Sequence, residues 1–105
     1  MRSVDLALYA DELAARAATL AAQLERARSR LRQEAIERCA RRALDEGSVA
    51  RLERLGLLCA SDARATRAEL RELAASLAAV ESLQVWVEER LAAAQEGLED
   101  ELPAA

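Results

Sequence analysis

The chain contains no histidine, so cysteines, carboxylates and arginines are the side chains to consider first for catalysis or metal binding. General acid–base catalysis, a catalytic triad and the Glu-x-x-His pairs of di-iron bundles are therefore not expected. Cys39 and Cys59 have no CxxC spacing, so we expect reduced, partly buried thiols rather than zinc ligands. The alternative for them is a disulfide at one end of the fold. The carboxylate clusters at 88–89 and 99–101 read as solvated charge. We predict no enzyme activity, no cofactor and no metal.

Seven arginines and two glutamates lie in residues 26–42, which resembles a nucleic-acid-binding helix by composition. On a helical wheel these arginines scatter around the circumference, and no aromatic residue lies between them to stack on bases. The spacing predicts internal ion pairs, with Glu34 between Arg30 and Arg38, and Glu37 four residues before Arg41. We read the segment as a solvated or interface helix. Phosphate or nucleic-acid contact, or an acidic protein partner, remains an alternative.

Composition predicts an all-α protein in one helical domain spanning residues 1–105. The chain is 52% hydrophobic but only 2% aromatic, and its apolar content is mostly Leu and Ala, which favour helices. The net charge of −4 and the pI near 4.9 argue against a general nucleic-acid binder. No apolar run is long enough to span a bilayer, and acids occur early in the chain, so we expect no membrane association and a cytoplasmic location.

Few residues interrupt the helical pattern, and they divide it into a long, a short and a long helix. We predict helices over about 4–46, 49–55 and 62–100, with a tail at 101–105. Ser3, Ser48 and either Ser61 or Asp62 are expected N-caps, Gly47 and Gly56 are expected left-handed C-terminal residues, and Gly97 or Pro103 is expected to end the last helix. Two such long helices predict an antiparallel, coiled-coil-like hairpin with the short helix folded over its closed end.

Apolar residues alternate at steps of four and three along both long helices, which predicts the buried seam of the hairpin. In the first helix the seam is Leu6, Ala10, Leu13, Ala17, Leu20, Leu24, Ala27 and Leu31, and in the last it is Thr66, Leu70, Leu73, Leu77, Val80, Gln84, Val87, Leu91, Ala94 and Leu98. After Leu31 the apolar residues continue as Ala35, Cys39 and Ala43, which we interpret as a stutter in the repeat.

More apolar residues are present than a single hairpin can cover. The first helix is apolar well beyond its seam, and LQVWV at 83–87 places apolar side chains on three sides of the last helix. We therefore expect these flanks to form an interface: Val4, Leu8, Ala15, Ala18, Ala22, Leu83, Val85 and Trp86. Trp86 is either an interface anchor or an edge residue of the hairpin core.

Charge predicts how two hairpins would pack. Residues 26–72 have a net charge of +4, whereas residues 1–25 and 73–105 have −2 and −6. Antiparallel packing places unlike charges together and makes a four-helix bundle homodimer. We thus predict a non-enzymatic helical interaction module that self-associates and offers a surface to a protein partner. The alternatives are a small acidic export-type chaperone or subunit of a hetero-complex, and phosphate or nucleic-acid contact through the Arg-rich turn end.

Overall fold

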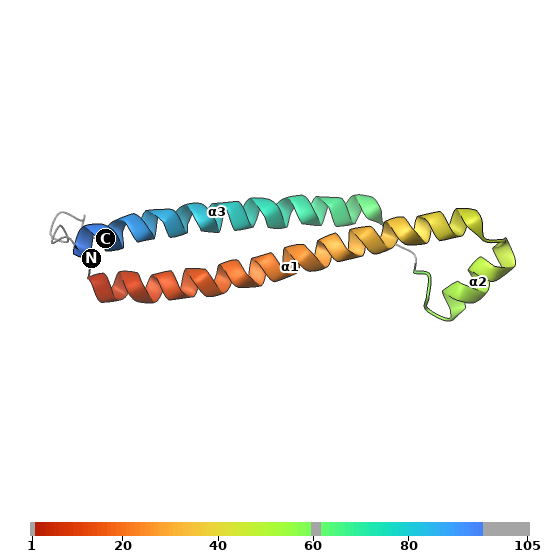
Figure 1. The fold of residues 1–105 in the computed structure, drawn as a ribbon, viewed down its shortest axis with the longest axis horizontal. Coiled ribbons are helices and arrows are strands. Elements are labelled where there is room, and N and C mark those ends of the chain that lie inside the picture. Colours follow the sequence, from red (N-terminus) through yellow and green to blue (C-terminus); the bar gives the residue numbers. More distant parts are fainter. Residues whose placement is uncertain (1, 60–61, 96–105) are drawn as a thin grey trace. The chain divides into compact units, whose positions relative to one another are not determined.

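The computed structural model describes residues 2–59 and 62–95. Three helices occupy most of this part of the chain: α1 (Ser3–Ala43), α2 (Glu46–Arg54) and α3 (Ala63–Gln95) (Figure 1). The described residues contain no strand, so the predicted all-α class is confirmed. None of the helices in those residues is both long and apolar enough to cross a membrane.

The chain divides into two compact units, and both long helices contribute to each. Unit 1 comprises residues 1–23 and 73–105, and unit 2 comprises residues 24–72. Each unit has its own buried residues, and the chemical character of those residues differs between the two.

In unit 1 the first half of α1 lies antiparallel to the second half of α3 (Figure 1). Its core is Leu6, Leu13 and Val87, with Ala10, Val80, Leu83 and Leu91 packed against it. The predicted seam is confirmed here, since each of its described residues is buried or half-buried, Gln84 included. Leu98 lies outside the described residues.

In unit 2 the buried residues are partly polar. Leu24, Ala27 and Leu58 are buried, but so are Glu34, Glu37 and Thr66. The pairing of Arg30 with Glu69 and of Glu34 with Thr66 shows that α1 and α3 are antiparallel here as well.

The predicted stutter after Leu31 is wrong. Ala35, Cys39 and Ala43 are all exposed, whereas Glu34 is buried and Arg41 is half-buried. After Leu31 the inward positions are Glu34, Glu37 and Arg41, so steps of three and four continue, but through charged residues. A search restricted to apolar residues follows the wrong side of the helix at this point.

The boundary between α1 and α2 also differs from the prediction. Ser48 is not the N-cap, because α2 begins earlier and Asp45 caps it by accepting a hydrogen bond from the Ser48 N–H (2.8 Å). Gly47 lies within the first turn of α2 and has no positive φ, so it does not end α1. An acidic side chain at the cap position also favours the positive end of the helix dipole, which explains why α2 starts here.

Gly56 has the predicted left-handed conformation, with φ of 75°. Its N–H donates to Glu53 O, and the next N–H, of Leu57, donates to Leu52 O (2.9 Å), which is the Schellman arrangement that ends a helix. At α3, Asp62 is the N-cap, since its carboxylate accepts from the N–H groups of Arg64 and Ala65. The expected stops at Gly97 or Pro103 lie outside the described residues.

The segment around α2 covers less apolar surface than expected. Of its five apolar residues, only Leu58 is buried, while Val49 and Leu52 are half-buried and Leu55 and Leu57 are exposed. The expectation that this segment buries its apolar groups over the closed end is therefore wrong for Leu55 and Leu57.

Candidate interaction surface and polar pocket

The eight predicted interface residues belong to unit 1, and seven are exposed in the single chain. Val4, Leu8 and Val85 are 59%, 64% and 53% exposed, which is high for large aliphatic side chains. Ala15, Ala18 and Ala22 are exposed as well. Leu83 is the exception, since it is half-buried against the core of unit 1.

These residues form one face on α1 but not on α3. At 100° per residue, the five residues of α1 lie within about 80° of one another, on the side opposite its seam. Val85 and Trp86 are adjacent in sequence and point about 100° apart on α3. The α1 residues thus share one side of the helix, which we call the outer face of α1 and which the exposed Asp11 interrupts, whereas the two α3 residues lie on different flanks.

Trp86 is 38% exposed and the guanidinium of Arg90 lies over its ring, 5.3 Å from the ring centroid. A cation over the face of an indole is attracted by the negative charge of the π system. Trp86 is therefore neither a fully buried core residue nor a freely solvated one, and its exposed part is available to a further partner.

A groove of about 460 Å³ runs along unit 1, and polar residues of α1 line part of it: Glu12, Arg16, Thr19 and Gln23. Its walls include Tyr9, which is 40% exposed, together with Leu13, Leu20 and Val80. Tyr9 was not among the predicted interface residues, and it lies near the seam direction of α1. Its exposure adds a second aromatic ring to the surface of unit 1.

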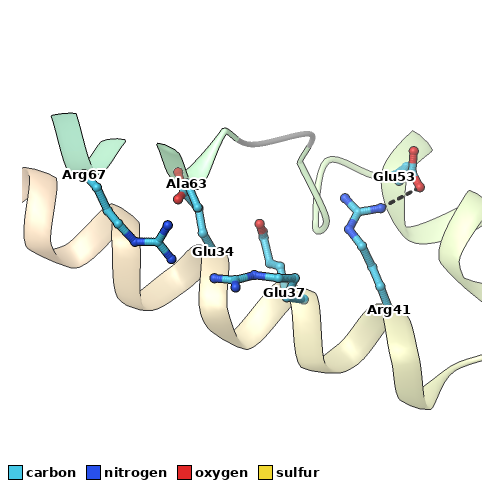
Figure 2. Close-up of a pocket in the computed structure, with 7 residues that line it drawn as sticks. Glu34, Glu37, Arg41, Glu53, Ala63 and Arg67 are labelled. Carbon is cyan, nitrogen blue, oxygen red and sulfur yellow. Dashed lines mark hydrogen bonds and ion pairs between the residues drawn. The ribbon is translucent and has the colours of Figure 1, made fainter. Parts of the chain in front are cut away.

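Unit 2 contains a pocket of about 430 Å³ that is lined almost entirely by charged side chains (Figure 2). Its lining residues come from all three helices: Glu34, Glu37, Arg38, Arg41, Glu53, Ala63 and Arg67. Figure 2 shows the Glu34 carboxylate extending from α1 toward Ala63 and the Arg67 side chain extending from α3 back toward α1. We call this site the polar pocket.

Glu34 is the most constrained group of the polar pocket. The residue is 8% exposed, and its Oε1 accepts a hydrogen bond from the Thr66 hydroxyl at 2.8 Å. Its Oε2 is buried and has no hydrogen-bond partner. Glu37, one turn later on α1, is 7% exposed. Buried carboxylates are costly unless donors surround them, so this pair of glutamates is an unusual feature of a small helical protein.

The arginines around the polar pocket are not equivalent. Arg41 donates to Glu53 Oε1 at 2.9 Å and to the Cys59 carbonyl at 3.0 Å, which ties α1 to α2 and to the segment after it. Arg38 and Arg67 are exposed, and neither forms an ion pair with a described residue. The pocket therefore has a floor with two buried glutamate residues and a rim with two guanidinium groups that form no ion pair with a described residue.

The ion pairs predicted within α1 are wrong for both glutamates. Arg30 pairs with Glu69 of α3, Glu34 with Thr66, and Arg41 with Glu53. Glu34 and Arg41 lie on the side of α1 that faces α3 and α2. Residues of those two helices therefore replace neighbours on α1 as their hydrogen-bond and ion-pair partners. Steps of three and four continued from Leu31 through polar residues could have identified Glu34 and Arg41 as inward-facing.

Both thiols are free, and both are exposed rather than partly buried, which corrects the expectation for Cys39 and Cys59. Cys59 Sγ lies 3.8 Å from the Gly56 carbonyl oxygen. In the described part of the chain, no group of three His, Cys, Asp or Glu residues is placed to hold a metal ion.

Comparison with known proteins gives no relative from which a function could be transferred. No family model matches the chain, and neither the curated proteins nor the solved structures include a significant match.

Proposed function

We propose that the chain is a non-enzymatic helical interaction module that pairs with a second copy of itself. In this proposal the outer face of α1 and the exposed part of Trp86 lie at the interface, and two copies complete a four-helix bundle. The observation that supports it best is the exposure of Val4, Leu8 and Val85 on a unit whose own core has three buried side chains.

The balance between buried and exposed apolar residues supports pairing. Among the described residues six hydrophobic side chains are buried, whereas nine large hydrophobic side chains are exposed. Burial of one such side chain contributes about 1.5–3 kcal/mol. A second helix pair placed on this surface would supply burial that the single chain lacks, and the alanines of α1 would allow close backbone approach.

Charge supports a second copy as the partner and an antiparallel arrangement. Unit 1 has a net charge of −7, from three arginines and ten acids, and unit 2 has +3, from twelve arginines and nine acids. Unit 1 of one copy is therefore complementary to unit 2 of another, while like units repel. Unit 2 also exposes Ile36, Leu44, Leu55 and Leu57, which gives unit 1 apolar side chains to contact.

Sedimentation over a concentration series tests the proposal. We expect a concentration-dependent shift from 11.4 kDa to twice that mass. Since Trp86 is the single tryptophan, its emission should move to shorter wavelength as the dimer forms. Replacement Trp86→Ala should weaken pairing by about 2 kcal/mol, or roughly thirtyfold.

The matched control is Gln95→Ala, which changes an exposed residue of α3 outside the predicted interface. A folded, soluble monomer at every concentration would contradict the proposal. Aggregation of the chain alone, with a stoichiometric complex formed only with another protein, would instead favour the export-type chaperone or hetero-complex alternative.

A further inference from the structure

The polar pocket of unit 2 contains both a carboxylate oxygen that lacks a hydrogen-bond donor and guanidinium groups that lack a carboxylate partner among the described residues. At the floor, Glu34 Oε2 is buried and accepts no hydrogen bond from a described residue. Glu37 is 7% exposed as a residue. At the rim, Arg38 and Arg67 have no carboxylate partner among the described residues. Arg41 does not change this balance, because Glu53 and the Cys59 carbonyl already accept its hydrogen bonds.

This arrangement excludes the simplest ligands. An inorganic anion would be attracted by Arg38 and Arg67 but repelled by the two buried carboxylates, which are screened less than exposed groups. A simple cation would be attracted by Glu34 and Glu37 but repelled by Arg38 and Arg67. A group that fills the pocket must present N–H donors toward Glu34 and Glu37 and an anionic acceptor toward the two arginines.

We propose that the polar pocket binds a small zwitterion with a guanidinium or ammonium group at one end and a carboxylate at the other. A guanidinium offers several N–H donors in one plane, which suits two carboxylates one helical turn apart on α1. The carboxylate of the ligand is a bidentate acceptor for Arg38 or Arg67. The volume of about 430 Å³ lies within the range of small-ligand pockets.

Arginine satisfies this description both as the free amino acid and as the last residue of a peptide. The site does not depend on the self-association proposed above, because its lining residues all belong to unit 2. Binding is therefore expected in the Trp86→Ala variant as well as in the unaltered chain, which separates failure of one proposal from failure of the other.

The test is an NMR titration of the full-length, ¹⁵N-labelled chain with L-arginine. We expect saturable shifts of the amides of 34–41 and 63–67 at millimolar ligand. Agmatine, which keeps the guanidinium and lacks the carboxylate, and acetate, which has only the carboxylate, should each bind at least tenfold more weakly. A peptide ending in Arg, compared with its C-terminally amidated form, distinguishes a chain end from the free amino acid as the source.

Three substitutions locate the site. Glu34→Gln and Glu37→Gln remove a floor charge, and Arg67→Gln removes a rim charge, so each should weaken L-arginine binding at least tenfold. Glu34→Gln retains an oxygen to accept from Thr66, and circular dichroism checks that the helices persist. Should it fail to fold, Glu37→Gln carries the same test.

Matched controls are Glu72→Gln and Arg71→Gln, which change exposed residues of α3 outside the pocket lining. They should leave L-arginine affinity unchanged. The proposal is overturned by an absence of saturable shifts at millimolar L-arginine, or by equal binding of L-arginine to the unaltered chain and to both floor variants. Equal affinity for agmatine would overturn the role of the carboxylate.

Discussion

Thr66 and Glu34 form the one buried hydrogen bond between side chains of α1 and α3. The Thr66 hydroxyl lies 2.8 Å from Glu34 Oε1 and 3.2 Å from the Asp62 carbonyl oxygen, and its single proton is placed best for the shorter contact. Among the described residues, this proton is the only hydrogen-bond donor to the Glu34 carboxylate, whose Oε2 is buried without a partner. The energetics of unit 2 therefore depend strongly on a few polar atoms.

Thr66→Val should destabilise the protein by about 1–3 kcal/mol, because valine keeps the shape of threonine but leaves both oxygens of Glu34 without a donor. Chemical denaturation at fixed protein concentration measures this, since self-association would make stability depend on concentration. In the Thr66→Val background, Glu34→Leu should recover stability, because it removes the unpaired buried charge.

The control for this pair is Ser82→Ala. Its hydroxyl donates to the Ala78 carbonyl on the surface of α3, so its loss should change the free energy of unfolding by less than about 0.5 kcal/mol. A Thr66→Val variant as stable as the unaltered chain would show that the Glu34 carboxylate finds another donor.

At the scale of the elements, α2 is the helix whose formation depends most on local bonds. It has nine residues and none of them is buried, so tertiary packing contributes little to it. Its start is held by Asp45, which accepts from both the N–H and the hydroxyl of Ser48, and its end is held by the turn at Gly56.

The Ser48 N–H and hydroxyl lower the pKa of Asp45 below its usual 3.8. Because the pKa is lower in the folded state than in the unfolded state, the charge of Asp45 stabilises the fold above pH 3.8, and this stabilisation is lost as the pH falls through the folded pKa. Asp45→Asn retains an accepting oxygen at the cap but has no charge to titrate.

We therefore expect Asp45→Asn to approach the unaltered chain in stability as the pH falls below 3.8, with the unaltered chain the more stable near pH 6. Denaturation midpoints of both proteins at pH 6 and pH 3 measure the change. The two proteins differ only at residue 45, so the difference between their midpoints isolates Asp45. A difference independent of pH would mean that its charge plays no part.

At the scale of the whole molecule, the two units differ in charge and in the nature of their buried residues. Unit 1 is acidic with an apolar core, and unit 2 is basic with buried glutamates. In the antiparallel pairing proposed above, each unit contacts the opposite unit of the second copy. The positions of the cysteines make this orientation testable, because Cys39 and Cys59 both belong to unit 2 and are exposed.

A short bismaleimide should not join two unaltered chains across the dimer if they are antiparallel, because unit 1 contains no cysteine. With Ala15→Cys, a thiol on the outer face of α1, we expect cross-links between position 15 of one copy and Cys39 or Cys59 of the other. Gel electrophoresis and peptide mass mapping identify them. Efficient Cys39–Cys39 cross-linking of the unaltered chain would indicate a parallel dimer and contradict the orientation.

The sequence by itself determined the class, the approximate helix bounds and the seam of unit 1. These depend on local and periodic properties. Leu and Ala favour helices throughout, and steps of three and four place Leu6, Leu13 and Val87 on one side of each helix. Gly56 was also assigned correctly from its residue type, and Asp62 was one of the two N-caps predicted for the last helix, because a left-handed turn and an N-cap have strong local preferences.

Only the tertiary structure decided what happens after Leu31. Glu34 and Arg41 occupy inward positions that a search for apolar residues passes over, and their partners Thr66 and Glu53 lie 32 and 12 residues away in the sequence. Whether a charged side chain at such a position turns to water or to another helix depends on which groups the fold brings opposite to it. For that physical reason the polar pocket could not be assembled from helical spacing alone.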